Sequence, residues 1–141
     1  MLFRSATGTT VQLPAGDTES GATPPSPDAV SADGSVVLIS SPAPLVPDDE
    51  DEGECESEAD CHYYRNLTDA YAWDAATGAV TMVSRSSTGA ASRHFSAGQD
   101  LLADGSGAVL VSRAVLVPGQ RDRGGELSVH GFVEVFARDL G

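Results

Sequence analysis

The sequence has no lysine, and all eight of its basic side chains are arginines. It also carries 21 Asp and Glu residues, which give the 141-residue chain a net charge of −13 at pH 7. A surface so poor in cations repels the phosphates of DNA and RNA, so the composition excludes a nucleic-acid-binding protein. Aromatic residues are also few, with four Phe, three Tyr and one Trp. Val, Leu, Ile and Ala must therefore fill the core of a chain that is long enough for one ordinary domain.

Long apolar runs, helical periodicity and catalytic motifs are missing as well. No apolar run approaches the roughly 18 residues that cross a bilayer, so we expect no membrane span. Residues 1–10 lack the apolar stretch of a secretory signal. No segment longer than a turn or two keeps a helical period. There is no Gly-x-Ser-x-Gly motif, and the glycines in residues 121–126 lack the strand-to-helix context of a phosphate-binding loop.

What the chain does contain is an internal repeat. "ADGSVVLISSPAPLVPD" (32–48) matches "ADGSGAVLVSRAVLVPG" (103–119) without a gap, at an offset of 71 residues. Two further pairs of segments match, 4–14 with 74–84 and 69–75 with 134–140. The shared unit is an apolar strand, an Asp-Gly turn, a second strand, a variable loop, a third strand, a Thr-Gly turn and a fourth strand. Such a recurring unit determines the architecture before any single motif does.

The residues around the Asp-Gly pairs predict paired strands. Glycine at positions 34 and 105 supplies the positive φ that tight hairpin turns require. The segments that follow, 36–40 and 108–112, are apolar without alternation, which is typical of strands covered on both faces. Large and small residues alternate in 71–73, as expected for a strand whose two faces meet different neighbours. The sequence predicts an all-β chain of nine short strands, two from a first unit, four from a second and three from a third.

The repeated unit resembles the WD40-like (PD40) β-propeller repeat, as found in the C-terminal propeller of the translocation protein TolB. The residues that carry the resemblance are "SADGSVVLISS" with "AYAWDAATG", and "LLADGSGAVLVS" with "VFARDLG". In that family they form a strand, a Ser-Pro-Asp-Gly-like turn, an apolar strand ending in Ser, and an aromatic strand running into Asp-x-x-Thr-Gly. The resemblance spans nearly the whole chain and implies tandem four-stranded antiparallel blades, which bury their faces by stacking.

The resemblance further implies a partial propeller of about two and a quarter blades. Residues 1–21 would be the end of one blade, residues 22–90 a complete blade, and residues 91–141 a blade lacking its last strand. A closed propeller takes about four to eight blades. We therefore expect the chain to be a fragment of a larger ring or to pair with other copies, since an open stack leaves an apolar face bare.

The complete blade carries an acidic loop insert at residues 48–68. Nine carboxylates lie within residues 48–60, which leaves a net charge of only about −4 on the rest of the chain. We expect a solvated acidic loop that is a candidate interaction site for a basic protein partner. Its candidate residues are Asp48, Asp49, Glu50, Asp51, Glu52, Glu54, Glu56, Glu58 and Asp60.

Metal binding is the alternative interpretation of the insert. Clustered carboxylates are the ligands that Ca²⁺ prefers. In an EF-hand register that starts at Asp48, however, Ala59 takes the twelfth position, where a bidentate Glu closes the site. We expect no cofactor, with weak calcium binding by the acidic loop as the alternative. A zinc site would need a second ligand pair, and of the three histidines only His62 lies near the cysteines.

Cys55 and Cys61 are the only cysteines. They either form a small disulfide that pins the loop in an oxidising compartment or stay as two free thiols. The extracytoplasmic habit of the family that the chain resembles favours the disulfide, and it implies a periplasmic or secreted protein.

Other polar residues have structural interpretations. His94 and His130 fall at loop positions, and Asp74 and Asp139 precede turns, where Asp commonly caps backbone N–H groups. We expect a non-catalytic, protein-binding propeller module. The alternative is the accessory propeller of a prolyl-oligopeptidase-like hydrolase whose catalytic domain lies outside this chain, because fold alone assigns neither function.

Overall fold

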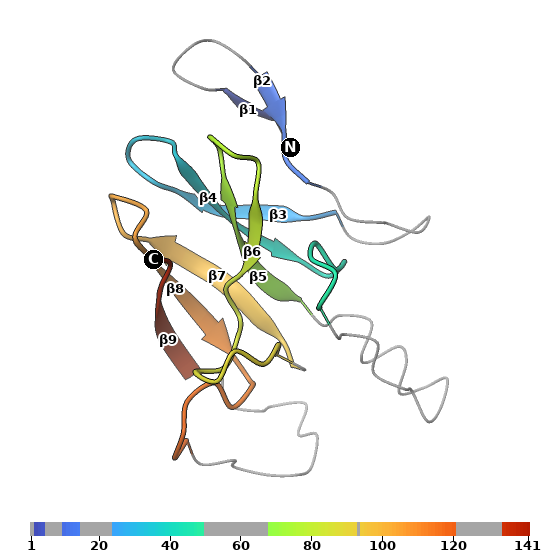
Figure 1. Ribbon diagram of the computed structural model, residues 1–141, viewed down its shortest axis with the longest axis vertical. Coiled ribbons are helices and arrows are strands. Elements are labelled where there is room, and N and C mark those ends of the chain that lie inside the picture. The colour runs from blue at the N-terminus through green and yellow to red at the C-terminus, as the bar shows by residue number, and fades with distance from the viewer. Residues whose placement is uncertain (1, 5–9, 15–23, 50–67, 93, 121–133) are drawn as a thin grey trace.

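A computed structural model describes residues 2–4, 10–14, 24–49, 68–92, 94–120 and 134–141. Within these ranges the chain forms nine strands and no helix, in three antiparallel sheets that follow one another along the chain (Figure 1). The first sheet pairs β1 (Leu2–Arg4) with β2 (Thr10–Gln12). The second runs in the order β3 (Ser26–Val30), β4 (Val36–Ser41), β5 (Asp69–Asp74) and β6 (Val80–Met82). The third comprises β7 (Ser96–Leu101), β8 (Gly107–Ser112) and β9 (Glu134–Asp139).

The prediction of an all-β chain is confirmed, with antiparallel sheets of four and three strands, none of them closed. The described part of the chain has no helix long and apolar enough to cross a membrane. The second and third sheets share their internal geometry. β4 pairs with β5, and β8 with β9, over six residues each. The first strand of each sheet is irregular at the same point of the repeat, after Pro27 in β3 and after Gly98 in β7.

The first Asp-Gly turn has the conformation that the sequence predicts. Gly34 has a φ of 74°, in the left-handed region that favours glycine. Asp33 Oδ1 accepts hydrogen bonds from the N–H of Ser35 at 2.9 Å and from the hydroxyls of Ser35 at 2.7 Å and Ser31 at 2.8 Å. These bonds hold the hairpin between β3 and β4 closed.

Asp74 caps a turn, as predicted, and Asp139 makes a similar bond to the backbone two residues on. Asp74 Oδ1 accepts hydrogen bonds from the N–H of Ala76 at 2.9 Å, the N–H of Thr77 at 2.8 Å and the hydroxyl of Thr77 at 2.9 Å. Asp139 Oδ1 accepts one from the N–H of Gly141 at 3.0 Å. Their recurrence in the sequence therefore has a structural cause.

We expect the carboxyl group of Asp33 to titrate with a pKa of about 2, below its ordinary value of 3.8. The N–H of Ser35, its hydroxyl and the hydroxyl of Ser31 all bond to the charged form and lower the pKa. Because the pKa is lowered in the folded state, the stabilisation is present above pH 3.8 and is lost as the pH falls through about 2. NMR titration of the carboxyl carbon measures this pKa. Ser35→Ala should raise it part of the way, since the backbone N–H remains, whereas a wild-type midpoint near 3.8 would contradict the prediction.

The second sheet lies between the other two and is covered on both faces. What we call its rear face consists of the buried side chains Val37, Ile39 and Trp73. Its front face consists of Leu38, Ala70 and Ala72. Leu13, just after β2, packs on the rear face, while Leu101 and Leu110 of the third sheet pack on the front face. β7 is the strand of the third sheet that contacts β3, β4 and β5.

Among the described residues, the third sheet is covered on one face only. Its rear face, formed by Ala108, Leu110 and Phe136, packs on the front face of the second sheet. Its front face is formed by Val109, Val111, Val135 and Ala137, which are half-exposed or exposed. The interpretation of residues 108–112 as a strand covered on both faces is therefore wrong for this face. The reason is that no sheet within the described residues lies over it.

Candidate functional site

The acidic insert, which is the predicted interaction loop, joins β4 to β5. The structure describes its first two residues, Asp48 and Asp49, and its last residue, Thr68. The remaining predicted interaction residues lie outside the described part of the chain: Glu50, Asp51, Glu52, Glu54, Glu56, Glu58 and Asp60. The two cysteines, Cys55 and Cys61, lie outside it as well. The structure therefore describes only the two ends of the insert.

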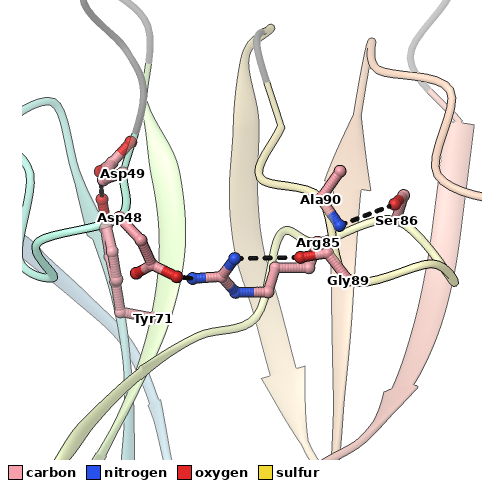
Figure 2. Close-up of polar contacts among 7 residues, drawn as sticks. All are labelled: Asp48, Asp49, Tyr71, Arg85, Ser86, Gly89 and Ala90. Carbon is pink, nitrogen blue, oxygen red and sulfur yellow. Dashed lines mark hydrogen bonds and ion pairs between the residues drawn. The ribbon is translucent and has the colours of Figure 1, made fainter.

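Tyr71 anchors the second acidic residue. Its side chain comes from β5 and is fully buried, and its hydroxyl donates a hydrogen bond to Asp49 Oδ2 (Figure 2). Burial, followed by this hydrogen bond, raises the pKa of Tyr71 far above its ordinary value, because both disfavour the phenolate. The hydroxyl therefore keeps its proton and remains a donor to Asp49 across the physiological pH range.

Arg85 anchors the first acidic residue from a different element. It lies in the segment that connects β6 to β7, and its Nη2 is 2.6 Å from Asp48 Oδ2 (Figure 2). Its Nη1 donates a hydrogen bond to Gly89 O at 3.0 Å. The Asp48 side chain is 67% exposed, so the ion pair contributes only about 0–1 kcal/mol to stability. Its effect is to place the start of the insert beside the connection between the second and third sheets.

The far end of the insert is attached to the core. Asp69, the first residue of β5, is fully buried and accepts a hydrogen bond from the Ser84 hydroxyl. Ser84 Oγ in turn accepts a hydrogen bond from the N–H of Ala70 at 3.1 Å. Both ends of the insert are thus fixed to the second sheet by buried groups.

The third sheet has a neutral counterpart of Asp49. Gln120 stands 71 residues after Asp49, at the matching position of the repeat. Its Oε1 accepts a hydrogen bond from the N–H of Leu116 at 2.8 Å, and its Nε2 donates one to Ala114 O at 3.1 Å. The side chain at this position therefore holds the loop after the second strand of each unit, and in the second unit that side chain carries charge.

The anchoring partners were missed by sequence reasoning. Tyr71 and Arg85 stand 22 and 37 residues along the chain from the carboxylates that they bind. No local motif links residues at such separations. The only signal in the sequence was the alignment of Asp49 with Gln120, which marks the position but not the partner.

Histidines and metal-ligand clusters do not add to this site within the described residues. His94 is exposed in the connection from β6 to β7, where its N–H bonds to Ser92 Oγ at 3.2 Å, and it is a loop residue as predicted. His62 and His130 lie outside the described residues. In the described ranges no group of three or more His, Cys, Asp or Glu side chains could hold a metal ion.

No protein family, curated protein or solved structure matches the chain. In the structure, Arg85, Tyr71 and Ser84 attach the two ends of a strongly acidic segment to the stacked sheets.

Proposed function

We propose that this chain is a non-catalytic protein-binding module built of propeller-type blades, and that its acidic insert binds a basic surface of a partner protein. The single observation that carries the proposal is the anchoring of Asp48 and Asp49 by Arg85 and Tyr71. The proposal includes an extracytoplasmic location, periplasmic or secreted, with a disulfide between Cys55 and Cys61.

The direction of sheet stacking supports the blade interpretation. The rear face of the third sheet packs on the front face of the second, and the rear face of the second packs on the residue after β2. The second and the third sheets therefore each pack their rear face on the sheet that precedes them in the chain. This head-to-tail stacking leaves the front face of the third sheet open among the described residues. In a partial propeller of about two and a quarter blades, further blades or other copies of the chain would cover that face.

The charge of the insert supports a basic partner. Nine carboxylates in residues 48–60 create a negative potential that attracts Lys and Arg side chains and speeds their encounter. Screening limits this attraction to a distance of about 8 Å at physiological ionic strength, so the position of the insert matters. Because Arg85 and Tyr71 hold its first two carboxylates, the rest of the charge begins at a fixed point of the surface.

Binding of a polylysine peptide, measured by isothermal titration calorimetry, tests the proposal. A variant with Glu52→Gln, Glu54→Gln, Glu56→Gln and Glu58→Gln loses four charges from the insert. We expect it to bind at least about ten-fold more weakly than the unaltered chain. Binding by the unaltered chain should also weaken as salt is added, because the attraction is electrostatic.

A matched control neutralises four carboxylates elsewhere in the chain: Asp17→Asn, Glu19→Gln, Asp122→Asn and Glu126→Gln. The total change in charge is the same in both variants. We expect the control to bind nearly as well as the unaltered chain. Equal weakening of the two variants would show that the peptide responds to net charge and would remove the insert from its proposed role.

A further inference from the structure

The loop after β8, residues 114–118, carries two exposed apolar side chains, and we call it the apolar loop. Val115 is 49% exposed and Val117 is 45% exposed. Leu116, between them, is buried in the core that the second and third sheets share. The loop is therefore fixed to the core by Leu116 while both valines stay at the surface. Exposed apolar side chains that gather at one place mark a candidate contact with another protein.

The matching loop of the second sheet shows that this exposure belongs to the repeated unit. Pro44 stands 71 residues before Val115, at the matching position, and is exposed as well. Val46, the counterpart of Val117, is half-buried. The second sheet is covered on both faces, yet its neighbours leave Pro44 in solvent. The exposure of Val115 therefore does not depend on which sheet lies over the third one.

A series of contacts links the apolar loop to the start of the acidic insert. Leu116 O accepts a hydrogen bond from the N–H of Ser87 at 2.7 Å. Ser87 belongs to the connection from β6 to β7, as does Arg85, whose guanidinium is paired with Asp48. Figure 2 shows Arg85 extending from this connection to Asp48. One connection therefore binds the apolar loop through its backbone and the acidic insert through its arginine.

Hydrogen bonds hold this connection in place. Arg85 and Ala91 form a β-bridge, and the N–H of Ser86 donates a hydrogen bond to Ala90 O at 2.8 Å. Arg138, from β9, donates through its Nη1 to Arg85 O at 2.9 Å. The connection is thus attached to the third sheet as well as to the second. The first carboxylate of the insert and the two valines therefore keep defined positions relative to each other.

The charge beside the apolar loop determines which partner fits. Nine carboxylates lie within residues 48–60, starting at Asp48. They attract a segment that carries Lys or Arg, and screening limits this attraction to about 8 Å at physiological ionic strength. A purely basic segment would leave Val115 and Val117 in water. A segment that also covers these valines gains affinity, because removing apolar surface from water is favourable.

We propose that the apolar loop is a second contact surface for the partner of the acidic insert, and that the partner segment carries large apolar side chains beside a run of Lys or Arg. The basic side chains bind the carboxylates of the insert, and the apolar side chains cover Val115 and Val117. This contact rests on the proposed function and deepens it by giving the composition of the partner segment.

Two synthetic peptides of equal charge test the contact. One is Lys-Lys-Lys-Lys-Gly-Leu-Gly-Leu, and in the other both leucines are replaced by serines. Fluorescence anisotropy with the 141-residue chain should show at least about ten-fold tighter binding of the leucine peptide. The amide NMR signals that differ between the two complexes should be those of residues 114–118. Equal affinities for the two peptides would overturn the proposal.

Paired variants of the protein locate the apolar contact. Val115→Ser combined with Val117→Ser should bind the leucine peptide about as weakly as the serine peptide, with the affinity for the serine peptide unchanged. The matched control combines Val30→Ser with Val135→Ser, two valines that are 45% and 70% exposed on other elements. It should keep the ten-fold preference for leucine. An equal loss of preference in the control would overturn the proposal, and thermal unfolding shows that both variants are folded.

The variant of the insert with Glu52→Gln, Glu54→Gln, Glu56→Gln and Glu58→Gln separates this contact from the proposed function. It should weaken the binding of both peptides by a similar factor and leave the preference for leucine in place. If both peptides weaken but the unaltered chain shows no preference for leucine, the apolar contact fails and the proposed function stands. If the variant binds both peptides as well as the unaltered chain does, both proposals fail.

Discussion

Leu38→Ala should lower the free energy of unfolding by about 2–5 kcal/mol. The Leu38 side chain is fully buried in the cluster that joins the front face of the second sheet to the third sheet, where it meets Leu101 and Leu110. Removing its methyl groups leaves a cavity between two sheets whose strands are hydrogen-bonded and can close only partly around it. Urea denaturation measures the loss, with the fluorescence of the single, buried Trp73 as the signal.

Val109→Ala is the matched control, because Val109 follows Leu38 by 71 residues and occupies the same position of the repeat. It is half-exposed on the uncovered front face of the third sheet. Its truncation should therefore lower the free energy of unfolding by about 1 kcal/mol or less. A loss as large as that of Leu38→Ala would show that the front face of the third sheet is covered in solution, contrary to the described packing.

Gly98→Ala should destabilise the protein by about 1–3 kcal/mol. A Cβ atom at Gly98 would lie 2.6 Å from Leu38 Cγ and 2.6 Å from Asp28 Oδ2, closer than real contacts allow. Leu38 is fully buried and has no room to move aside. The N–H of Gly98 also donates to Ser40 Oγ at 3.0 Å, which ties β7 to the second sheet. The added methyl group would push these two sheets apart and weaken that bond.

A double variant checks the physical cause of this loss. With Leu38→Ala also present, the new Cβ atom at Gly98 enters the space that the leucine left, so the double variant should lose less than the sum of the two single losses. Gly107→Ala serves as a second comparison. A Cβ atom there would lie 2.9 Å from the end of the Leu102 side chain, which is 54% exposed and can rotate away, and 3.2 Å from Arg138 O, so we expect a smaller loss than at Gly98. Strict additivity in the double variant would contradict the steric explanation.

Several elements of the fold could be predicted because their causes lie close together in the chain. The pairs Asp33-Gly34 and Asp104-Gly105 predicted hairpins, and strands flank both pairs in the structure. Asp74 was predicted to cap a turn, and its bonds to Thr77 confirm it. Each of these features depends on a glycine, a carboxylate or an alternation pattern within a few residues.

Other features could not be predicted because their causes lie far apart in the chain. Nothing near Gly98 marks it as a place where only glycine fits, since the obstruction is the Leu38 side chain of another sheet. The acidic insert was evident from its composition, but its anchors at Tyr71 and Arg85 were not. The sequence also did not indicate which sheet face would be bare, since residues 36–40 and 108–112 are equally apolar and, among the described residues, only the first of these segments is covered on both sides.

The sequence by itself determined that the chain is all-β, the order of its strands, its turns and the location of its negative charge. The alternation of residue types and the turn residues act between neighbours along the chain, and the repeat can be recognised by comparing segments of the sequence. The tertiary structure alone decided which faces of the described sheets are buried and which residues hold the acidic insert. The physical reason is that the order of residues along a strand distinguishes its two faces, whereas contacts between distant segments of the chain determine what covers each face.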